Sequence, residues 1–340
     1  AIITTALIAG AIADRAKFGA WLVFAVLWST LVYFPVAHWV WGGSGWLGEL
    51  GVLDFAGGTA VHVNAGAAAL ALALVLGRRV GWPRERMRPH NLPLVLLGAA
   101  LLWFGWFGFN AGSELAADAV TGVAFLNTQV ATAAALLGWI FVEWLRYGKP
   151  TTLGAASGAV AGLVGITPAC AFLEPLGAIA LGVIVGVVCS LFVSLKHRAG
   201  YDDSLDVVAV HLGGGAVGSL LIGFLAVEVL DEQGALVAGE TGLLYGGSVS
   251  LLGVQAVGVL AVAAYSFVVA WLIGIVIEKT IGFRVAPEVE VEGIDLHEHA
   301  ESGYDFSATG PSLVGAGTGA QPAAAPAAEP ARSASEKVAG

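Results

Sequence analysis

Charged residues are scarce in this chain of 340 residues: Lys, Arg, Asp and Glu together make up 12%, whereas 57% of the residues are hydrophobic. Such a composition lies outside the range of soluble globular domains. The apolar stretches also lack the alternation of apolar and polar residues that the short strands of an outer-membrane barrel would show. The sequence therefore predicts an all-α polytopic membrane protein.

Cysteine is equally rare. Cys170 and Cys189 both lie within apolar stretches, where a cysteine most often serves as a small core residue, so we expect neither a disulfide nor a thiolate ligand. No Cys, Glu or third His stands at metal-ligand spacing beside the two histidines discussed below, and no nucleophile of an intramembrane enzyme stands there either. We therefore predict no metal, no cofactor and no enzymatic activity.

What the sequence does contain is a series of apolar segments, each long enough to cross about 30 Å of hydrocarbon as a helix. They lie at 18–41, 60–77, 91–112, 120–145, 152–171, 175–195, 205–229 and 243–278. Residues 1–13 have the character of the end of a further helix, and the chain opens without Met and without the n-region of a signal peptide. We expect about eight complete helices plus part of one, in a chain that lacks its N-terminal helices.

Lys and Arg are confined to every second connection between these segments. They occur at 15–17, 78–88, 146–149, 196–198 and 279–284, and are absent from 42–59, 113–119, 172–174 and 230–242. The positive-inside rule places the basic loops and the C-terminus in the cytoplasm, and we expect a multi-pass protein of the cell membrane. The net charge of −10 lies largely in the loop at 231–240 and after Pro287, so nothing suggests nucleic acid as a partner.

The sequence divides into three parts. We expect a transmembrane domain at 1–284, a cytoplasmic C-terminal segment at 285–306 and a tail at 307–340. The tail is rich in Ala, Pro, Gly and Ser and has almost no large apolar side chains. Burial within it could not offset the entropy of ordering, so the tail is predicted to be disordered.

One motif occurs twice. Asp54 precedes His62 by eight residues, and Asp203 precedes His211 by the same distance. The predicted topology gives the two histidine-bearing helices opposite directions, as in inverted-repeat transporters, which carry the substrate site where the halves meet. An ionisable residue at membrane depth usually faces a cavity or a partner. We expect the histidines to converge in a pore within a five-plus-five helix arrangement; an ordinary interhelical hydrogen bond is the alternative for either histidine alone.

The two aspartates stand a few residues before their helices. A carboxylate at this place accepts hydrogen bonds from the free N–H groups of the first turn and meets the positive end of the helix dipole. For Asp54 and Asp203 we therefore favour structural capping over direct contact with a substrate. Asp206 could share that role with Asp203.

Aromatic residues cluster at the predicted outer helix ends. Trp41 follows Trp39 at one of them, and Trp106 and Phe109 lead into Ser113 at another. An interfacial aromatic belt accounts for such clusters, and so does a vestibule in which a small cation rests on aromatic faces. The residues alone leave these two interpretations open.

These stretches resemble the ammonium transporter family, the Amt/Rh proteins, and among them the prokaryotic Amt type. The resemblance covers about residues 1–306 and rests on the motifs at 53–66, 89–93, 106–113 and 202–211. It implies the ammonium-transporter fold, an eleven-helix bundle assembled as a homotrimer with one pore per subunit. It also implies the activity: ammonium is recruited at an outer aromatic site and deprotonated, and ammonia passes a twin-histidine apolar pore with net charge transfer. A passive ammonia channel of the Rh kind and an ammonium sensor are the alternatives.

The resemblance also assigns roles to residues. Carried over by motif, the pore histidines are His62 and His211, the recruitment site and gate comprise Trp41, Trp106, Phe109 and Ser113, and the supporting acidic residues are Asp54 and Asp203. The family's other gate phenylalanine belongs just upstream of Ala1. Leu212 stands where the family usually has Gly, which leaves the pore width open at that point. The stretch from Gly282 to His299 resembles the family's C-terminal segment, which implies inter-subunit coupling and a PII-type signalling protein as a possible partner.

Overall fold

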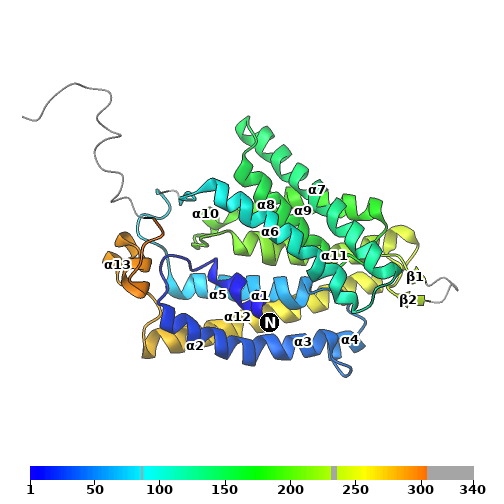
Figure 1. Ribbon diagram of the computed structural model, residues 1–340. Coiled ribbons are helices and arrows are strands. Elements are labelled where there is room, and N and C mark those ends of the chain that lie inside the picture. Colours follow the sequence, from blue (N-terminus) through cyan, green and yellow to red (C-terminus); the bar gives the residue numbers. More distant parts are fainter. Residues whose placement is uncertain (86, 231–235, 305–340) are drawn as a thin grey trace, which may run out of the picture.

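The structure, a computed structural model, describes residues 1–85, 87–230 and 236–304, and the predicted tail at 307–340 lies outside them. Within this part, seven apolar helical segments of at least 18 residues are long enough to cross a membrane, and an eighth, Thr152–Ile166, is shorter. With the short first helix they form one bundle whose long helices run in roughly the same direction in the view of Figure 1. The predicted all-α membrane fold is confirmed.

The elements follow one another in the predicted order. The apolar segments of the bundle comprise α2 (Phe18–Trp28), a π-helical turn (Ser29–Tyr33) and α3 (Phe34–Trp41); a second π-helical turn (Gly58–Val63) and α5 (Asn64–Leu76); α6 (Leu92–Asn110) with a 3-10 turn (Ala111–Glu114); α7 (Ala119–Tyr147); the shorter α8 (Thr152–Ile166); α9 (Pro175–Phe192); a third π-helical turn (Val208–Gly213) and α11 (Gly214–Leu225); and α12 (Val249–Thr280). The shorter elements are α1 (Ile2–Ala9), α4 (Trp46–Glu49), α10 (Leu195–Ala199), a 3-10 turn (Leu243–Tyr245), α13 (Pro287–Glu292) and a π-helical turn (Asp295–His299).

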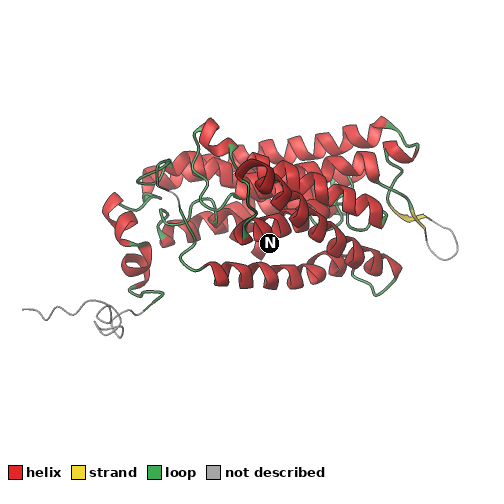
Figure 2. Cartoon of the chain, turned by 90° about the horizontal axis from the view of Figure 1, so that it is seen from above, coloured by secondary structure: helices red, strands yellow, loops and turns green. Residues whose placement is uncertain are grey.

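Two short strands are the exception to the helical architecture. Strands β1 (Val229–Leu230) and β2 (Leu236–Ala238) pair antiparallel in the connection between α11 and α12. Figure 2 shows them at one end of the bundle, beyond the ends of the long helices. They therefore lie away from the crossing of the helices at the centre.

Local sequence signals fix several helix starts. Asn91, Asp118 and Thr151 each precede a helix and accept a hydrogen bond from a backbone N–H of its first turn. Such caps satisfy donors that the helix itself leaves unpaired. Helix α7 ends at Tyr147, and the φ of +76° at the following Gly148 lies in the left-handed region that favours glycine.

Small residues allow the membrane helices to pack closely. A Cβ atom at Gly186 of α9 would overlap the backbone of Ala135 in α7, and a Cβ atom at Gly218 of α11 would overlap the backbone of Gly165 in α8. Without a hydrophobic driving force between helices in lipid, close backbone approach of this kind is a main source of packing energy. These glycines therefore set the spacing of the helices around the site.

The two histidine-bearing segments cross at the centre of the bundle. Each π-helical turn packs against the α-helix that follows the other turn, and from the crossing α5 and α11 extend toward opposite ends (Figure 1). A Cβ atom at Gly215 would lie 2.7 Å from the carbonyl oxygen of Gly58. Across the same contact, the hydroxyls of Thr59 and Ser219 are 2.9 Å apart and both are buried. The halves thus meet backbone to backbone.

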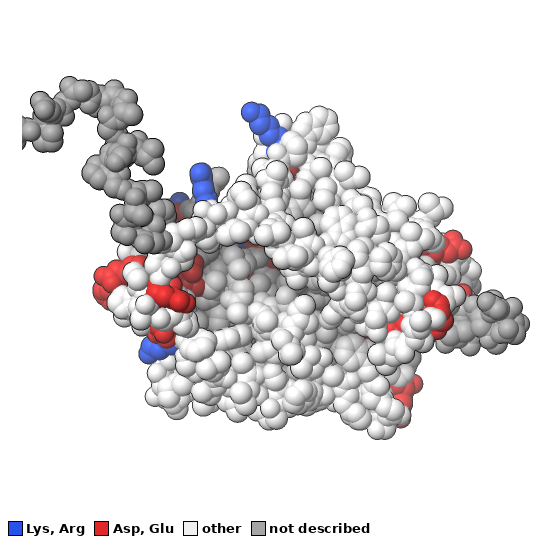
Figure 3. Space-filling model, viewed as in Figure 1, with Lys and Arg blue, Asp and Glu red and all other residues white. Residues whose placement is uncertain are grey.

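Charged side chains gather at the ends of the helices. On the face shown in Figure 3, Lys, Arg, Asp and Glu lie over the region of α13, at the end of α7 and, for acidic residues, at the opposite end, and the surface between is almost free of charge. This uncharged band is what a lipid-facing surface requires.

Ion pairs and hydrogen bonds of three basic side chains gather at one end of the bundle. The Arg79 guanidinium binds the buried carboxylate of Asp202 at 2.7 and 2.9 Å, and the buried Arg15 donates to the Asp202 carbonyl at 2.5 Å. Arg284 binds Glu290 at 2.7 Å. Burial acts to raise the pKa of Asp202, but the hydrogen bonds and charge of Arg79 outweigh it and lower that pKa. The positive-inside rule predicts that the basic connections share one side of the membrane, and in the structure Arg15, Arg79 and Arg284 lie at the same end of the bundle.

Candidate functional site

The two histidines of the repeated motif meet inside the bundle. His62 and His211 each lie in a π-helical turn, a rare local geometry that often marks functional sites. Both side chains are buried, and their Nδ1 atoms are 3.2 Å apart. At this distance one imidazole donates to the other. The predicted convergence of the two residues is therefore present in the structure.

Aromatic rings surround His62. The Trp106 indole lies nearly parallel to the imidazole, with ring centroids 5.4 Å apart and an interplanar angle of 19°. Phe109 lies 6.2 Å from His62 and 5.4 Å from Trp106, again between ring centroids. The Nε2 atom of His62 is buried and has no hydrogen-bond partner in the described part of the chain. That nitrogen is therefore a polar atom without a protein partner, which a small polar molecule could satisfy.

A cavity of about 410 Å³ lies on the Phe109 side of the histidines. Trp41, Phe109 and Ser113 line it together, as the resemblance implied, and so do Tyr33 and Phe55. Aromatic faces attract a small cation, and the Ser113 hydroxyl, which donates to the Phe109 carbonyl at 2.7 Å, keeps lone pairs with which it can accept. The arrangement suits a cation such as ammonium.

Some of this lining was missed by the sequence interpretation. Tyr33 stands eight residues before Trp41 on the same apolar segment, a spacing that returns to one face of a helix and could have indicated it. Phe55 directly follows the capping aspartate, and no signal in the sequence sets it apart. Trp106 is not part of the cavity lining, because it lies behind Phe109 against His62.

Asp54 connects this cavity to the first histidine. Its carboxylate oxygens accept hydrogen bonds from the backbone N–H groups of residues 57–60 at 2.6 to 2.9 Å, at the start of the turn that carries His62. Its backbone carbonyl accepts a hydrogen bond from the Trp41 indole at 2.8 Å. Burial raises the pKa of Asp54, and the four N–H donors oppose that rise by stabilising the carboxylate. The geometry is that of a helix cap.

Asp203, the counterpart of Asp54 in the repeat, is bound differently. One of its oxygens accepts from the Val208 N–H at 2.7 Å, and the other is buried without a partner among the described residues. Burial and the nearby Asp206 raise the pKa of Asp203 to about 6. Asp206 does not cap the helix with its side chain; it pairs with Lys196 at 2.6 Å. The two halves are therefore alike in sequence and unlike in electrostatics.

A second cavity lies on the other side of the histidine pair. It measures about 290 Å³ and is lined by His211, by Leu102 and its neighbours on α6, and by residues of α8. Helix α6 passes all three regions in turn, with Leu102 at this cavity, Trp106 beside His62 and Phe109 at the first cavity. At 1.5 Å per residue, the two cavities are about 10 Å apart along the helix. The histidine pair therefore separates them.

Leu212 does not narrow this route. Its backbone and Cβ pack against Gly66 of α5, and in the described part of the chain it lines neither cavity beside the histidines. The departure from the family pattern therefore falls in the contact between the two halves.

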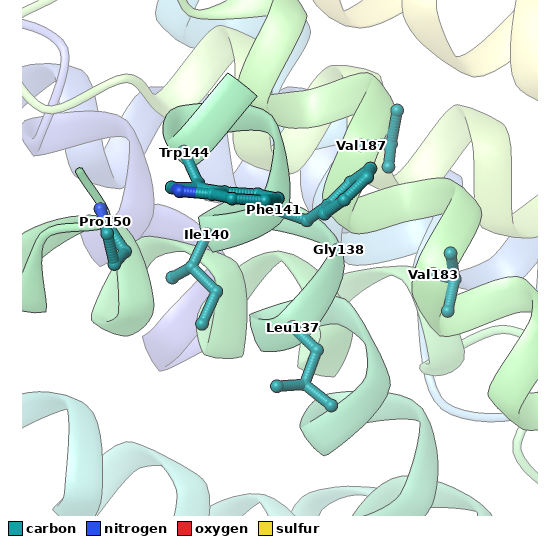
Figure 4. Close-up of a pocket in the computed structure, with 8 residues that line it drawn as sticks. All are labelled: Leu137, Gly138, Ile140, Phe141, Trp144, Pro150, Val183 and Val187. Atoms are coloured by element: carbon teal, nitrogen blue, oxygen red, sulfur yellow. The ribbon is translucent and has the colours of Figure 1, made fainter. Parts of the chain in front are cut away.

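A further cavity, of about 720 Å³, is of another kind. Figure 4 shows the Phe141 ring of α7 beside Val187 of α9, with Trp144 and Pro150 on its other side. The lining residues carry no charge, and their one polar side-chain group is the Trp144 indole N–H, a donor that cannot accept from ammonium, so this cavity is not a candidate site for that cation.

Comparison with known proteins agrees with this geometry. The sequence model of the Ammonium Transporter Family matches residues 1–304 of this chain. A protein of Mycobacterium bovis named ammonium transporter is 56% identical over 322 residues, which are 92% of this chain and 68% of that protein.

Solved structures agree as well. The chain is similar to Candida albicans Mep2, with a TM-score of 0.77, 39% identity and coverage of 84% of this chain and 64% of Mep2. It is also similar to a structure titled Sensor Amt Protein, with a TM-score of 0.79, 32% identity and coverage of 87% and 74%. The chain thus spans about two thirds of the length of the Mycobacterium and Candida relatives, and it belongs to the Ammonium Transporter Family.

Proposed function

We propose that the protein carries ammonium across a membrane by recruiting the cation in the Trp41 cavity and conducting ammonia past His62 and His211. The observation that carries this proposal is the buried histidine pair, bonded at 3.2 Å, between two cavities. The name ammonium transporter of the curated relatives supports the choice of substrate.

Physical chemistry favours deprotonation before passage. A bare cation in an apolar pore loses its hydration, and no set of aromatic contacts returns that energy. Taking a pKa of about 10 as for an alkylammonium group, giving up the proton near pH 7 costs about 4 kcal/mol. Desolvation of the cation and a neighbouring base offset a cost of this size. Neutral ammonia then passes without the charge penalty.

The histidine pair can serve both the ammonia and the proton. His62 Nε2 has no protein partner, so it can accept a proton or hydrogen-bond ammonia arriving from the Phe109 side. If it accepts a proton, the Nδ1 proton shared between the rings moves to His211, and the Nε2 proton of His211 leaves toward the second cavity. Each imidazole gains one proton and loses one, so the pair ends in the other neutral tautomer. Such a relay would make transport electrogenic.

The test uses the full-length protein in proteoliposomes on a solid-supported membrane, with current recorded on an ammonium jump and no imposed potential. We expect a transient current in the wild type that His62→Ala and His211→Ala abolish. His90→Ala is the matched control, because His90 is exposed and its ring packs on Tyr304 away from the pore. It should leave the current unchanged.

Other outcomes separate the alternatives. A pH change inside the vesicles without current would indicate a passive ammonia channel. Absence of both signals in a protein that still binds ammonium would favour a sensor. Unchanged selectivity and current in both histidine variants would overturn the pore assignment.

We further propose that the protein is a homotrimer of the cell membrane with its C-terminus in the cytoplasm and a PII-type protein as partner of residues 285–306. Three features support this assembly. The C-terminal segment is bound at the end of the bundle that holds the basic connections, through Glu290 to the Val80 N–H at 2.7 Å and through Glu298 to the Phe18 N–H at 2.9 Å. Its outward side chains are mainly acidic, and the apolar α7 face of Figure 4 offers area for contact between subunits.

A further inference from the structure

A buried hydroxyl stands behind the aromatic residue that packs on His62. Thr167 follows the last residue of α8 and is fully buried. Its hydroxyl donates to the Leu163 carbonyl at 2.6 Å and accepts from the Trp106 indole N–H at 2.9 Å. Because the hydroxyl proton is committed to the carbonyl, the oxygen is held in place as an acceptor for the indole.

This hydrogen bond is the polar contact that orients the Trp106 ring. Trp106 is 2% exposed, and its N–H is the only polar group on the ring, so without Thr167 the donor would be buried and unpaired. The ring plane lies 19° from that of His62. Among the described ring contacts, the His211 ring touches only that of His62. The orientation of the whole pair therefore depends on the Trp106 side.

The same turn also holds the first cavity. The Thr167 carbonyl accepts from the Ala56 N–H at 3.3 Å, and the Pro168 carbonyl accepts from the Phe55 N–H at 3.1 Å. Phe55 lines the cavity, whereas Thr167 itself does not touch it. Thr167 thus binds Trp106, which packs on His62, and Ala56, which lines the recruitment cavity, but Thr167 itself does not line that cavity.

We propose that Thr167 is a positioning residue for transport: its hydroxyl fixes the Trp106 indole against His62 and so aims the free Nε2 of His62 into the substrate path. This inference rests on the proposed function. Because the hydroxyl acts through Trp106 on His62, we expect it to affect the maximal rate of transport. Because Thr167 does not line the cavity, we expect recruitment of the cation to be unchanged.

The test compares two substitutions in the full-length protein by ammonium-driven current. Thr167→Val keeps the shape and removes the hydroxyl, and it should lower the maximal current about tenfold, as expected for an unpaired buried donor that shifts its neighbours. The ammonium concentration for half-maximal current should stay within about twofold of the wild type, since Trp41 and Ser113 are untouched. Thr167→Ser keeps the hydroxyl and should restore the maximal current.

Thr132→Val is the matched control. Thr132 is also fully buried and donates to the carbonyl four residues earlier, at 2.6 Å, but no indole N–H binds it in the described structure. It should keep the wild-type maximal current. An equal loss in Thr132→Val, a normal maximal current in Thr167→Val, or a change confined to the half-maximal concentration would each overturn the proposal. The wild-type current and its loss in His62→Ala test the proposed function separately, so the two failures are distinguishable.

Discussion

Removal of the Asp54 carboxylate should be among the most destabilising single changes in this protein. Four backbone N–H groups of residues 57–60 donate to it, and Asp54 is 5% exposed. An ordinary helix cap contributes about 1 kcal/mol. A buried donor left unpaired costs about 1 to 3 kcal/mol, so four unpaired donors would cost about 4 kcal/mol or more, and each donor that water or local relaxation serves lowers that cost.

Two further substitutions calibrate this value. Asp54→Asn keeps one carbonyl oxygen for two of the donors and turns an NH₂ group toward the others, so it should cost roughly half as much. Asp118→Ala removes an exposed cap that accepts from the Thr121 N–H at 3.1 Å, and it should cost about 1 kcal/mol or less.

The assay is thermal unfolding of the purified protein in detergent, followed by tryptophan fluorescence and by size-exclusion chromatography after heating. The midpoints should rank wild type, Asp118→Ala, Asp54→Asn and Asp54→Ala, from highest to lowest. A midpoint for Asp54→Ala no lower than that of Asp118→Ala would refute the capping argument. Loss of transport in Asp54→Asn at an unchanged midpoint would instead point to direct contact with the substrate.

Two further predictions concern helix packing and the ion pairs at one end of the bundle. Gly186→Ala should lower the thermal midpoint, because the new Cβ meets the backbone of Ala135. At Gly98 nothing lies within 4 Å of a new Cβ, so Gly98→Ala should leave the midpoint unchanged or raise it. Equal midpoints of the two variants would contradict the packing argument. The pKa of Asp202 is lowered in the fold, so the stability that its pair with Arg79 contributes is present above the unfolded pKa of about 4 and lost as the pH falls further. Thermal midpoints measured from pH 7 down to 3 should fall at the acid end in the wild type, and Arg79→Ala should lower the midpoint at pH 7 and flatten the acid dependence.

The positions of the membrane helices could be predicted from hydropathy and charge alone. The segment expected at 18–41 is continuous in the structure from Phe18 to Trp41, because an apolar run between basic and Gly-rich connections leaves little choice. The segment expected at 152–171 ends earlier, at Ile166. Thr167 keeps helical φ and ψ, but Pro168 has no N–H to continue the helical hydrogen bonds, and the carbonyls of residues 167 and 168 bind the N–H groups of residues 56 and 55.

The meeting of His62 and His211 could also be predicted, because repetition in opposite directions brings equivalent positions together. The π-helical turns that carry them could not, since hydropathy does not distinguish i→i+5 from i→i+4 hydrogen bonding. The different environments of Asp54 and Asp203 also could not be predicted from the sequence. Their sequence contexts match, and only the placement of backbone N–H groups and of Asp206 separates the two carboxylates.

The contact between the two halves has a consequence for motion. With the backbones of Gly58 and Gly215 in contact and the hydroxyls of Thr59 and Ser219 bonded in a buried site, rocking one half over the other would break packing and hydrogen bonds at the centre of the protein. Movements of that kind take microseconds to milliseconds, whereas side-chain rotations can occur in nanoseconds. The permeation route proposed above, which needs only turns of the Phe109 ring and the imidazoles, is therefore compatible with a scaffold that stays still.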